Sequence, residues 1–219
     1  MQTIDLRTIK TVFICPDHNE KYNERRKHME TILAKHGFTN VIMYKSGTDY
    51  PQCLQYALYN ILQQNLDTPV FIVEDDIVFH TNPKLVFDLP ADTDAFYFGV
   101  AGTCMDFEDT GRNRLVNTND YEMYDDTFIR IKNMLCAHAV LYLGRKYKET
   151  LSKVTLSSDM PCDVDMCKLQ PKFTIYGLQF PICWQSKKFN KTDWNEHITK
   201  IRLNASGCWE YSEAVEDDE

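Results

Sequence analysis

Three consecutive carboxylates, Glu74, Asp75 and Asp76, stand between two apolar runs in the segment PVFIVEDDIVFH, residues 69–80. Three like charges side by side repel one another, and the apolar residues on both sides leave them little water. A hard divalent cation such as Mg²⁺ or Mn²⁺ relieves this repulsion, because it prefers oxygen ligands and takes one or two carboxylates together with substrate phosphates. The segment therefore predicts a metal site; the alternatives are a solvated acidic turn and a cluster at a helix N-terminus.

The spacing of the acids adds a geometric expectation. If the strand continues through them, alternate side chains share a face, so Glu74 and Asp76 point one way and Asp75 the other. At about 3.3 Å per residue the two same-face carboxylates lie ~6–7 Å apart. That separation suits two carboxylates that reach a metal and a ligand hydroxyl from the edge of a sheet, where open α/β sheets bind their ligands.

The elements that must position these acids alternate between strand and helix. The pattern predicts an α/β fold with a mostly parallel central sheet and helices on both faces. A capping box at Asp17 and Glu20 and a terminal Gly37 mark the ends of the first helix. In the first half we expect strands at 11–15, 40–44, 69–73 and 95–102, with helices at 16–37 and 51–65. In the second half we expect a long loop at 103–127, strands at 137–144 and 173–185, and helices at 145–154 and within 159–170.

Composition narrows the class of protein. A net charge of −8 over 219 residues argues against nucleic acid as a partner, because phosphate neutralisation needs clustered Lys and Arg. No apolar stretch is long enough for a transmembrane helix, and MQTIDLRTIK lacks the apolar core of an export signal. We therefore expect a cytoplasmic location and reduced thiols for the eight cysteines.

Several catalytic signatures are missing from the sequence. There is no GxxxxGK[ST], no GxGxxG after a strand, no HExxH and no GxSxG. The sequence thus lacks the motifs that define P-loop NTPases, dinucleotide-binding folds, zincin proteases and α/β-hydrolases.

The ordered set TVFIC, NERRKHM, CLQYALYNIL and VFIVEDDIVF resembles nucleotide-sugar-dependent glycosyltransferases of GT-A fold. The likeness is to the family that includes lipopolysaccharide-type and collagen galactosyltransferases, and it spans about residues 11–186. It continues in AHAVLYL, the Pro-x-Asp turn PCD at 161–163 and Gln185. Small glycosyltransferases of large DNA viruses share it. The first turn, ICPDHN, departs from the family pattern, as does QYALYN, which lacks a Ser-His pair.

This resemblance implies roles for individual residues. Asp76 would bind Mn²⁺ (or Mg²⁺) at the diphosphate, Glu74 would support the metal through water, and Asp75 would meet the ribose or the sugar. Cys15, Pro16 and His18 would line the nucleotide pocket, and Arg25 or Arg26 would pair with base or phosphate unless both are solvated. His197 would be a further metal or phosphate ligand, or else a surface residue.

An acceptor hydroxyl also needs a general base. PCDVD offers Asp163 and Asp165 at the start of a helix; Asp163 matches the Pro-x-Asp position, with an ordinary helix N-cap as its alternative. The resemblance further implies one domain, 1–219. This domain would have a Rossmann-like nucleotide-binding half at about 1–102, an acceptor half at about 103–205 and an acidic tail at 206–219.

The expected function is metal-dependent transfer of a sugar from a nucleotide diphosphate, with UDP as the expected nucleotide. The acceptor would be a hydroxyl of a glycan or glycoprotein, including a viral capsid protein in host cytoplasm, and inversion rests on Asp163. Two rivals stay open: a metal-dependent phosphotransferase or phosphohydrolase that uses the acids directly, and a non-catalytic binding module of the same fold.

Overall fold

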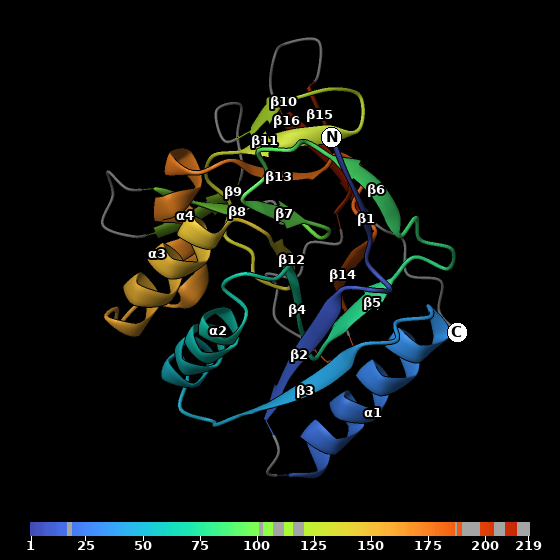
Figure 1. The fold of residues 1–219 in the computed structure, drawn as a ribbon, viewed down its shortest axis with the longest axis vertical. Coiled ribbons are helices and arrows are strands. Elements are labelled where there is room, and N and C mark those ends of the chain that lie inside the picture. Colours follow the sequence, from blue (N-terminus) through green and yellow to red (C-terminus); the bar gives the residue numbers. More distant parts are fainter. Residues whose placement is uncertain are drawn as a thin grey trace.

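The structure is a computed structural model, and the described residues are 1–16, 19–100, 103–106, 112–115, 121–186, 188–189, 198–203 and 209–213. An eight-stranded mixed sheet forms its centre (Figure 1). In spatial order the strands are β10 (Tyr121–Met123), β11 (Phe128–Ile131), β13 (Ile175–Leu178), β7 (Ala95–Tyr97), β12 (Ala139–Tyr142), β4 (Val70–Glu74), β2 (Lys10–Pro16) and β3 (Val41–Ser46).

The strands nearest the acids follow the predicted β-α-β-α-β order. β2 pairs in parallel with both β3 and β4. The crossovers are α1 (Glu20–Lys35) and α2 (Gln52–Gln64). Because these strands are parallel, their carboxyl ends meet at one edge of the sheet.

The prediction of a mostly parallel sheet is wrong, because the sheet is mixed. β12 lies antiparallel between β4 and β7, and β11 lies antiparallel beside β13. Every residue of β12 is buried, so its apolar run AVLY is indistinguishable in sequence from an interior parallel strand. The direction of such a strand is set by its connection, which the hydrophobic pattern does not encode.

Helices cover both faces of the sheet, as predicted. The side chains of β2 alternate, with Val12 and Ile14 in one apolar core and Phe13 and Cys15 in the other. The first core is closed by α2, α3 (Arg145–Leu156) and α4 (Cys162–Leu169). A short 3₁₀ turn, Gln170–Lys172, follows α4. The second core is closed by α1, through Met29 and Leu33.

Four antiparallel strand pairs surround the main sheet. They are β1 (Gln2–Asp5) with β6 (Val86–Leu89), β5 (Ile77–Phe79) with β14 (Cys183–Gln185), β8 (Thr103–Asp106) with β9 (Arg112–Leu115), and β15 (Ile198–Leu203) with β16 (Trp209–Glu213). The loop predicted at 103–127 is therefore wrong in part, since β8, β9 and β10 fall within it. β16 also lies inside the segment predicted as a tail, of which 206–208 and 214–219 lie outside the described residues.

The predicted C-terminal end of α1 is confirmed, and its predicted N-cap is not. Gly37 has φ +79°, the left-handed conformation that glycine adopts readily after a helix. The N-cap is Asn19, whose side chain accepts a hydrogen bond from the Tyr22 amide. The predicted cap at Asp17 is thus replaced by Asn19, an equally good capping residue two positions later.

A buried lysine fixes the connection that leads into β4. The Lys148 side chain from α3 is fully buried, and its Nζ donates to the carbonyl oxygens of Asn65 (2.7 Å) and Thr68 (2.9 Å). These carbonyls follow the C-terminus of α2, where a cationic donor is favourable. Burial lowers the pKa of Lys148 from 10.5 to about 8.

This lysine predicts a pH dependence of stability. Between about pH 8 and pH 10.5 the unfolded chain keeps the Lys148 proton that the folded protein has lost. The contribution of Lys148 to the free energy of unfolding therefore rises with pH. We expect urea unfolding to show wild type gaining about 3 kcal/mol relative to Lys148→Met across that window. A difference between the two proteins that does not change with pH would contradict this assignment.

Candidate active site

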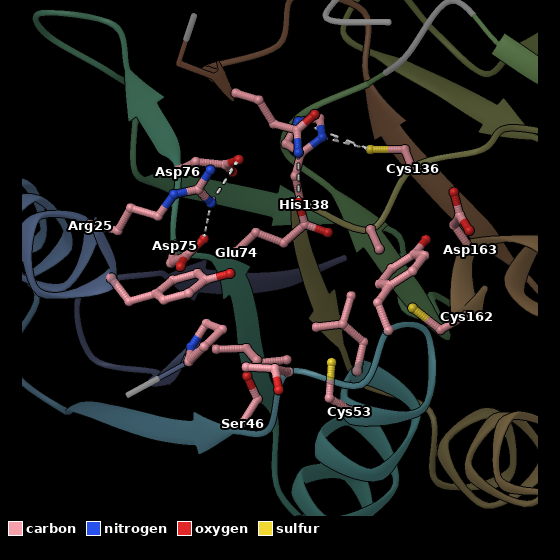
Figure 2. Close-up of a pocket in the computed structure, with 18 of the residues that line it drawn as sticks. Arg25, Ser46, Cys53, Glu74, Asp75, Asp76, Cys136, His138, Cys162 and Asp163 are labelled. Atoms are coloured by element: carbon pink, nitrogen blue, oxygen red, sulfur yellow. Dashed lines mark hydrogen bonds and ion pairs between the residues drawn. The ribbon is translucent and has the colours of Figure 1, made fainter. Parts of the chain in front are cut away.

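A cavity of about 580 Å³ opens at the edge where β2, β3 and β4 end. It is lined by the end of β2, α1, the β3–α2 connection, the three acids, Val100 after β7, the segment before β12, the start of α4 and Gln185 on β14. Figure 2 shows Arg25 and Asp163 on opposite sides of this cavity, with Glu74 between them. The acids predicted at a strand end therefore do lie in a ligand-sized hollow.

The acids do not continue the strand. β4 ends at Glu74, and Asp75 and Asp76 form a turn into β5. The expectation that Asp75 points away from its neighbours is wrong, because alternation holds only in extended backbone. Instead Asp75 and Asp76 meet the same guanidinium nitrogen.

That nitrogen belongs to Arg25 on α1. Its Nη1 donates to Asp75 Oδ1 at 2.7 Å and lies 3.5 Å from Asp76 Oδ2, as drawn in Figure 2. Its Nη2 donates to the carbonyl oxygen of Phe189 at 2.6 Å. The helix that carries it is held against β5 by a 2.7 Å hydrogen bond between His28 Nε2 and the Ile77 carbonyl oxygen.

Each aspartate keeps one oxygen for another ligand. Asp75 Oδ2 and Asp76 Oδ1 are buried and have no hydrogen-bond partner. Their residues are only 6% and 4% exposed, so water does not replace the missing partners cheaply. Two carboxylates that share one cation and each retain a free buried oxygen form an incomplete ion-binding arrangement.

Glu74 relieves the crowding of charge in a different way. Its Oε2 accepts a 2.7 Å hydrogen bond from Gln185 Nε2 on β14. Burial, followed by repulsion from Asp76 and Asp75, raises the pKa of Glu74 to about 8. Burial and Asp75 also raise the pKa of Asp76, against the lowering effect of Arg25. The three acids thus coexist with one internal cation, Arg25, and with a raised pKa at Glu74.

The donor set fits a hard divalent cation bound together with a ligand. Carboxylate oxygens are what Mg²⁺ and Mn²⁺ prefer, and one or two of them suffice when phosphates complete the shell. Within the ranges that the structure describes, no group of three or more His, Cys, Asp or Glu side chains is arranged to hold a metal. Asp75 and Asp76, which both line the cavity, would be the carboxylate ligands of such a cation, and a bound ligand would have to supply the remaining oxygens.

The two predicted base candidates have different surroundings. Asp163, in the first turn of α4, lines the cavity, and burial is the main cause of its raised pKa. The N-cap of α4 is Pro161, so Asp163 is not the capping residue. Asp165 does not line the cavity; its Oδ1 accepts from Ser158 Oγ at 3.1 Å and lies 3.5 Å from Lys168 Nζ.

The other predicted site residues divide between the cavity and its surroundings. Pro16 lines the cavity. Cys15 is fully buried in the core behind it, where burial and the nearby Asp75 raise its pKa to about 12. Arg26 does not line the cavity, and its Nε lies 3.7 Å from Glu30 Oε1. His18 and His197 lie outside the described residues.

The structure adds cavity residues that the sequence did not single out. Cys136 Sγ lies 3.0 Å from His138 Nδ1, and both residues line the cavity from the segment before β12. The carbonyl of His138 accepts the Glu74 amide hydrogen bond at 3.0 Å, which ties this segment to the end of β4. The Cys-x-His spacing can be seen in the sequence LCAHAV, but a strand-like apolar run does not indicate that its first residues face a cavity.

The imidazole of His138 fits against the backbone of Gly99. A Cβ at position 99 would lie 1.8 Å from His138 Nε2 and 2.5 Å from its Cδ2. His138 is 6% exposed, so the ring has little room to move. This close approach explains why glycine follows β7 at this point.

We expect Gly99→Ala to lower the free energy of unfolding by about 1–3 kcal/mol through overpacking against His138. Urea unfolding measures this directly. Gly47→Ala is the control, because its added Cβ would meet only Cys53 Cβ at an ordinary 3.7 Å. Equal losses in the two variants would contradict the assigned role of His138.

Comparison with protein-family models and with curated proteins gave no match to this chain. None of the helices in the described part of the chain combines the length and the apolar character that a membrane crossing demands. Function must therefore be argued from the cavity itself.

Proposed function

We propose that this protein is a metal-dependent glycosyltransferase of GT-A type that moves a sugar from a nucleotide diphosphate, with UDP as the expected nucleotide, to an acceptor hydroxyl. The observation that carries the proposal is the Asp75–Asp76 pair. Both residues line a cavity at the carboxyl ends of parallel strands, and each has one buried carboxylate oxygen without a hydrogen-bond partner. Such an edge is where open α/β sheets bind nucleotides, and diphosphate oxygens complete the shell of a divalent cation.

The donor side of the cavity carries both acidic and basic side chains, Asp75 and Asp76 beside Arg25. Asp76 would hold the cation, as the sequence predicts. Asp75, predicted to meet the ribose or the sugar, is now assigned to the cation as well, because both carboxylates contact Arg25. A bound Mn²⁺ or Mg²⁺ would offset the negative charge that develops on the leaving diphosphate. Arg25 lies beside the two carboxylates with a fixed positive charge, suited to phosphate oxygens. The resemblance in sequence over about residues 11–186 supports the same assignment.

The acceptor side is assigned to Asp163. Its carboxylate would take the proton of the acceptor hydroxyl while the acceptor oxygen bonds to the anomeric carbon and the bond from that carbon to the phosphate oxygen breaks. The bonding electrons leave with the diphosphate. A raised pKa makes Asp163 a stronger base than an ordinary aspartate. Attack from the side opposite the diphosphate gives inversion, and the acceptor class is a glycan or a glycoprotein.

Donor turnover tests this function against its enzymatic rival. We expect slow, Mn²⁺-dependent release of UDP from a UDP-sugar, with water as the acceptor, and no hydrolysis of p-nitrophenyl phosphate under the same conditions. Phosphate-ester hydrolysis without UDP-sugar turnover would instead favour a phosphohydrolase. Absence of both activities and of metal-dependent nucleotide binding would favour a non-catalytic module.

A further inference from the structure

The Arg25 side chain is held in place from both ends of its guanidinium. Beyond its contacts with Asp75 and Asp76, its Nη2 donates to the Phe189 carbonyl oxygen, and its Cζ lies 5.6 Å from the centre of the Phe189 ring. The same ring packs edge-on against His28, with 5.0 Å between ring centres. The Arg25 side chain is 12% exposed. An arginine with these contacts cannot leave the acids without breaking several of them.

The segment that holds Arg25 is itself attached to α1. Lys188 Nζ forms a 2.7 Å ion pair with Glu24 Oε1, and it lies 5.1 Å from the centre of the Phe189 ring. Both partners of the ion pair are exposed, so it contributes little by itself. The packing of Phe189 against Arg25 and His28 is the stronger attachment. The guanidinium is therefore a permanent part of the site rather than a mobile surface charge.

A fixed guanidinium changes which ligands the acid pair accepts. Arg25 contacts both aspartates and already offsets one of the two negative charges that would attract a divalent cation. That cation would also lie within a few ångströms of the guanidinium in a poorly hydrated site, where repulsion between like charges is strong. A diphosphate that enters with the cation reverses this balance, because its negative charge is attracted by both.

We propose that Arg25 is a fixed counter-ion that opposes binding of free divalent metal and makes the Asp75–Asp76 pair bind the cation tightly only together with a diphosphate ligand. This inference rests on the proposed function and extends it. It assigns to Arg25 the coupling between metal and nucleotide. The cation and the diphosphate then enter as one complex, and loss of one after sugar transfer favours loss of the other.

The test measures free Mn²⁺ by electron paramagnetic resonance in titrations of the full chain, with and without saturating UDP. For wild type we expect UDP to tighten Mn²⁺ binding at least tenfold. For Arg25→Gln we expect Mn²⁺ alone to bind at least tenfold more tightly than it binds wild type, about 1.4 kcal/mol, with a smaller effect of UDP. Arg26→Gln is the matched control: it removes the same charge one residue away, outside the cavity lining, and should behave as wild type.

The outcomes separate this inference from the proposed function. If UDP tightens Mn²⁺ binding to wild type but folded Arg25→Gln binds free Mn²⁺ no better, the counter-ion role is overturned and the function stands. If Arg25→Gln gains Mn²⁺ affinity while UDP has no effect on either protein, the function is overturned and the repulsion of free metal is supported. Should Arg25→Gln fail to fold, Arg25→Met takes its place in the same titrations, and free Mn²⁺ bound no more tightly than by wild type overturns the counter-ion role.

Discussion

Asp76→Ala is expected to abolish the Mn²⁺-dependent binding of UDP. The variant removes Asp76 Oδ1, one of two buried carboxylate oxygens without a hydrogen-bond partner among the described residues that line the cavity, and with it a ligand of the cation. Loss of one ligand from a site with only two protein carboxylates should weaken metal-assisted UDP binding by at least about 100-fold, or ~2.7 kcal/mol. Calorimetric titration of UDP in the presence of Mn²⁺ measures the change.

The fold should survive this substitution. Asp75 keeps its 2.7 Å contact with Arg25, and removal of Asp76 lessens the repulsion that raises the pKa of Glu74. The thermal midpoint without ligand should therefore stay close to that of wild type. Asp92→Ala, at an exposed position, is the control for loss of one negative charge. Unchanged, Mn²⁺-dependent UDP affinity in Asp76→Ala would contradict the assignment of the metal site.

Asp163→Asn is expected to slow the chemical step while donor binding is kept. Loss of a general base costs about 10²–10⁴-fold in rate. Asparagine keeps the shape of the side chain at the start of α4 but cannot accept the acceptor proton. Because Asp163 lies across the cavity from Arg25 (Figure 2), UDP affinity in the presence of Mn²⁺ should change by no more than about threefold, less than 1 kcal/mol. Release of UDP from a UDP-sugar gives the rate, and calorimetry gives the affinity.

Asp165→Asn separates the two candidates for the base. Asp165 is buried against Ser158 and does not line the cavity, so its substitution should act on stability more than on rate. A large loss of rate in Asp165→Asn, with Asp163→Asn active, would exchange the two assignments. Equal and small effects on rate would argue that neither carboxylate takes the proton.

Local signals in the sequence predicted the half of the fold that carries the acids. Apolar runs marked β2, β3 and β4, and glycine at position 37 marked the end of α1, because each depends on a short stretch of chain. The order of β12 in the sheet, and its direction, depend instead on a connection through residues 121–137. β8 and β9 were missed because TCMD and RNRL hold too few apolar residues to mark a strand with a buried face.

The sequence predicted the acids of the site but not the residues that hold them in place. Pairing of Arg25 rather than Arg26 with the acids follows from helical phase: Arg25, Met29 and Leu33 are spaced four residues apart and face inward together. Arg26 is spaced four residues from Glu30 and pairs with it outside the cavity. That phase was readable from the sequence. The contact of Arg25 with Phe189 joins segments 164 residues apart and leaves no local signal.

The most direct test of the central claim is the thermal stability of the wild-type protein with UDP, with Mn²⁺ and with both together. A ligand bound only by the folded state adds about 2.7 kcal/mol of stability at 100 times its dissociation constant. For a chain of this length that corresponds to a rise of about 5–10 °C in the midpoint. We predict a rise of this size with UDP and Mn²⁺ together and a much smaller one with either alone. Equal midpoints with and without Mn²⁺ in the presence of UDP would contradict the account.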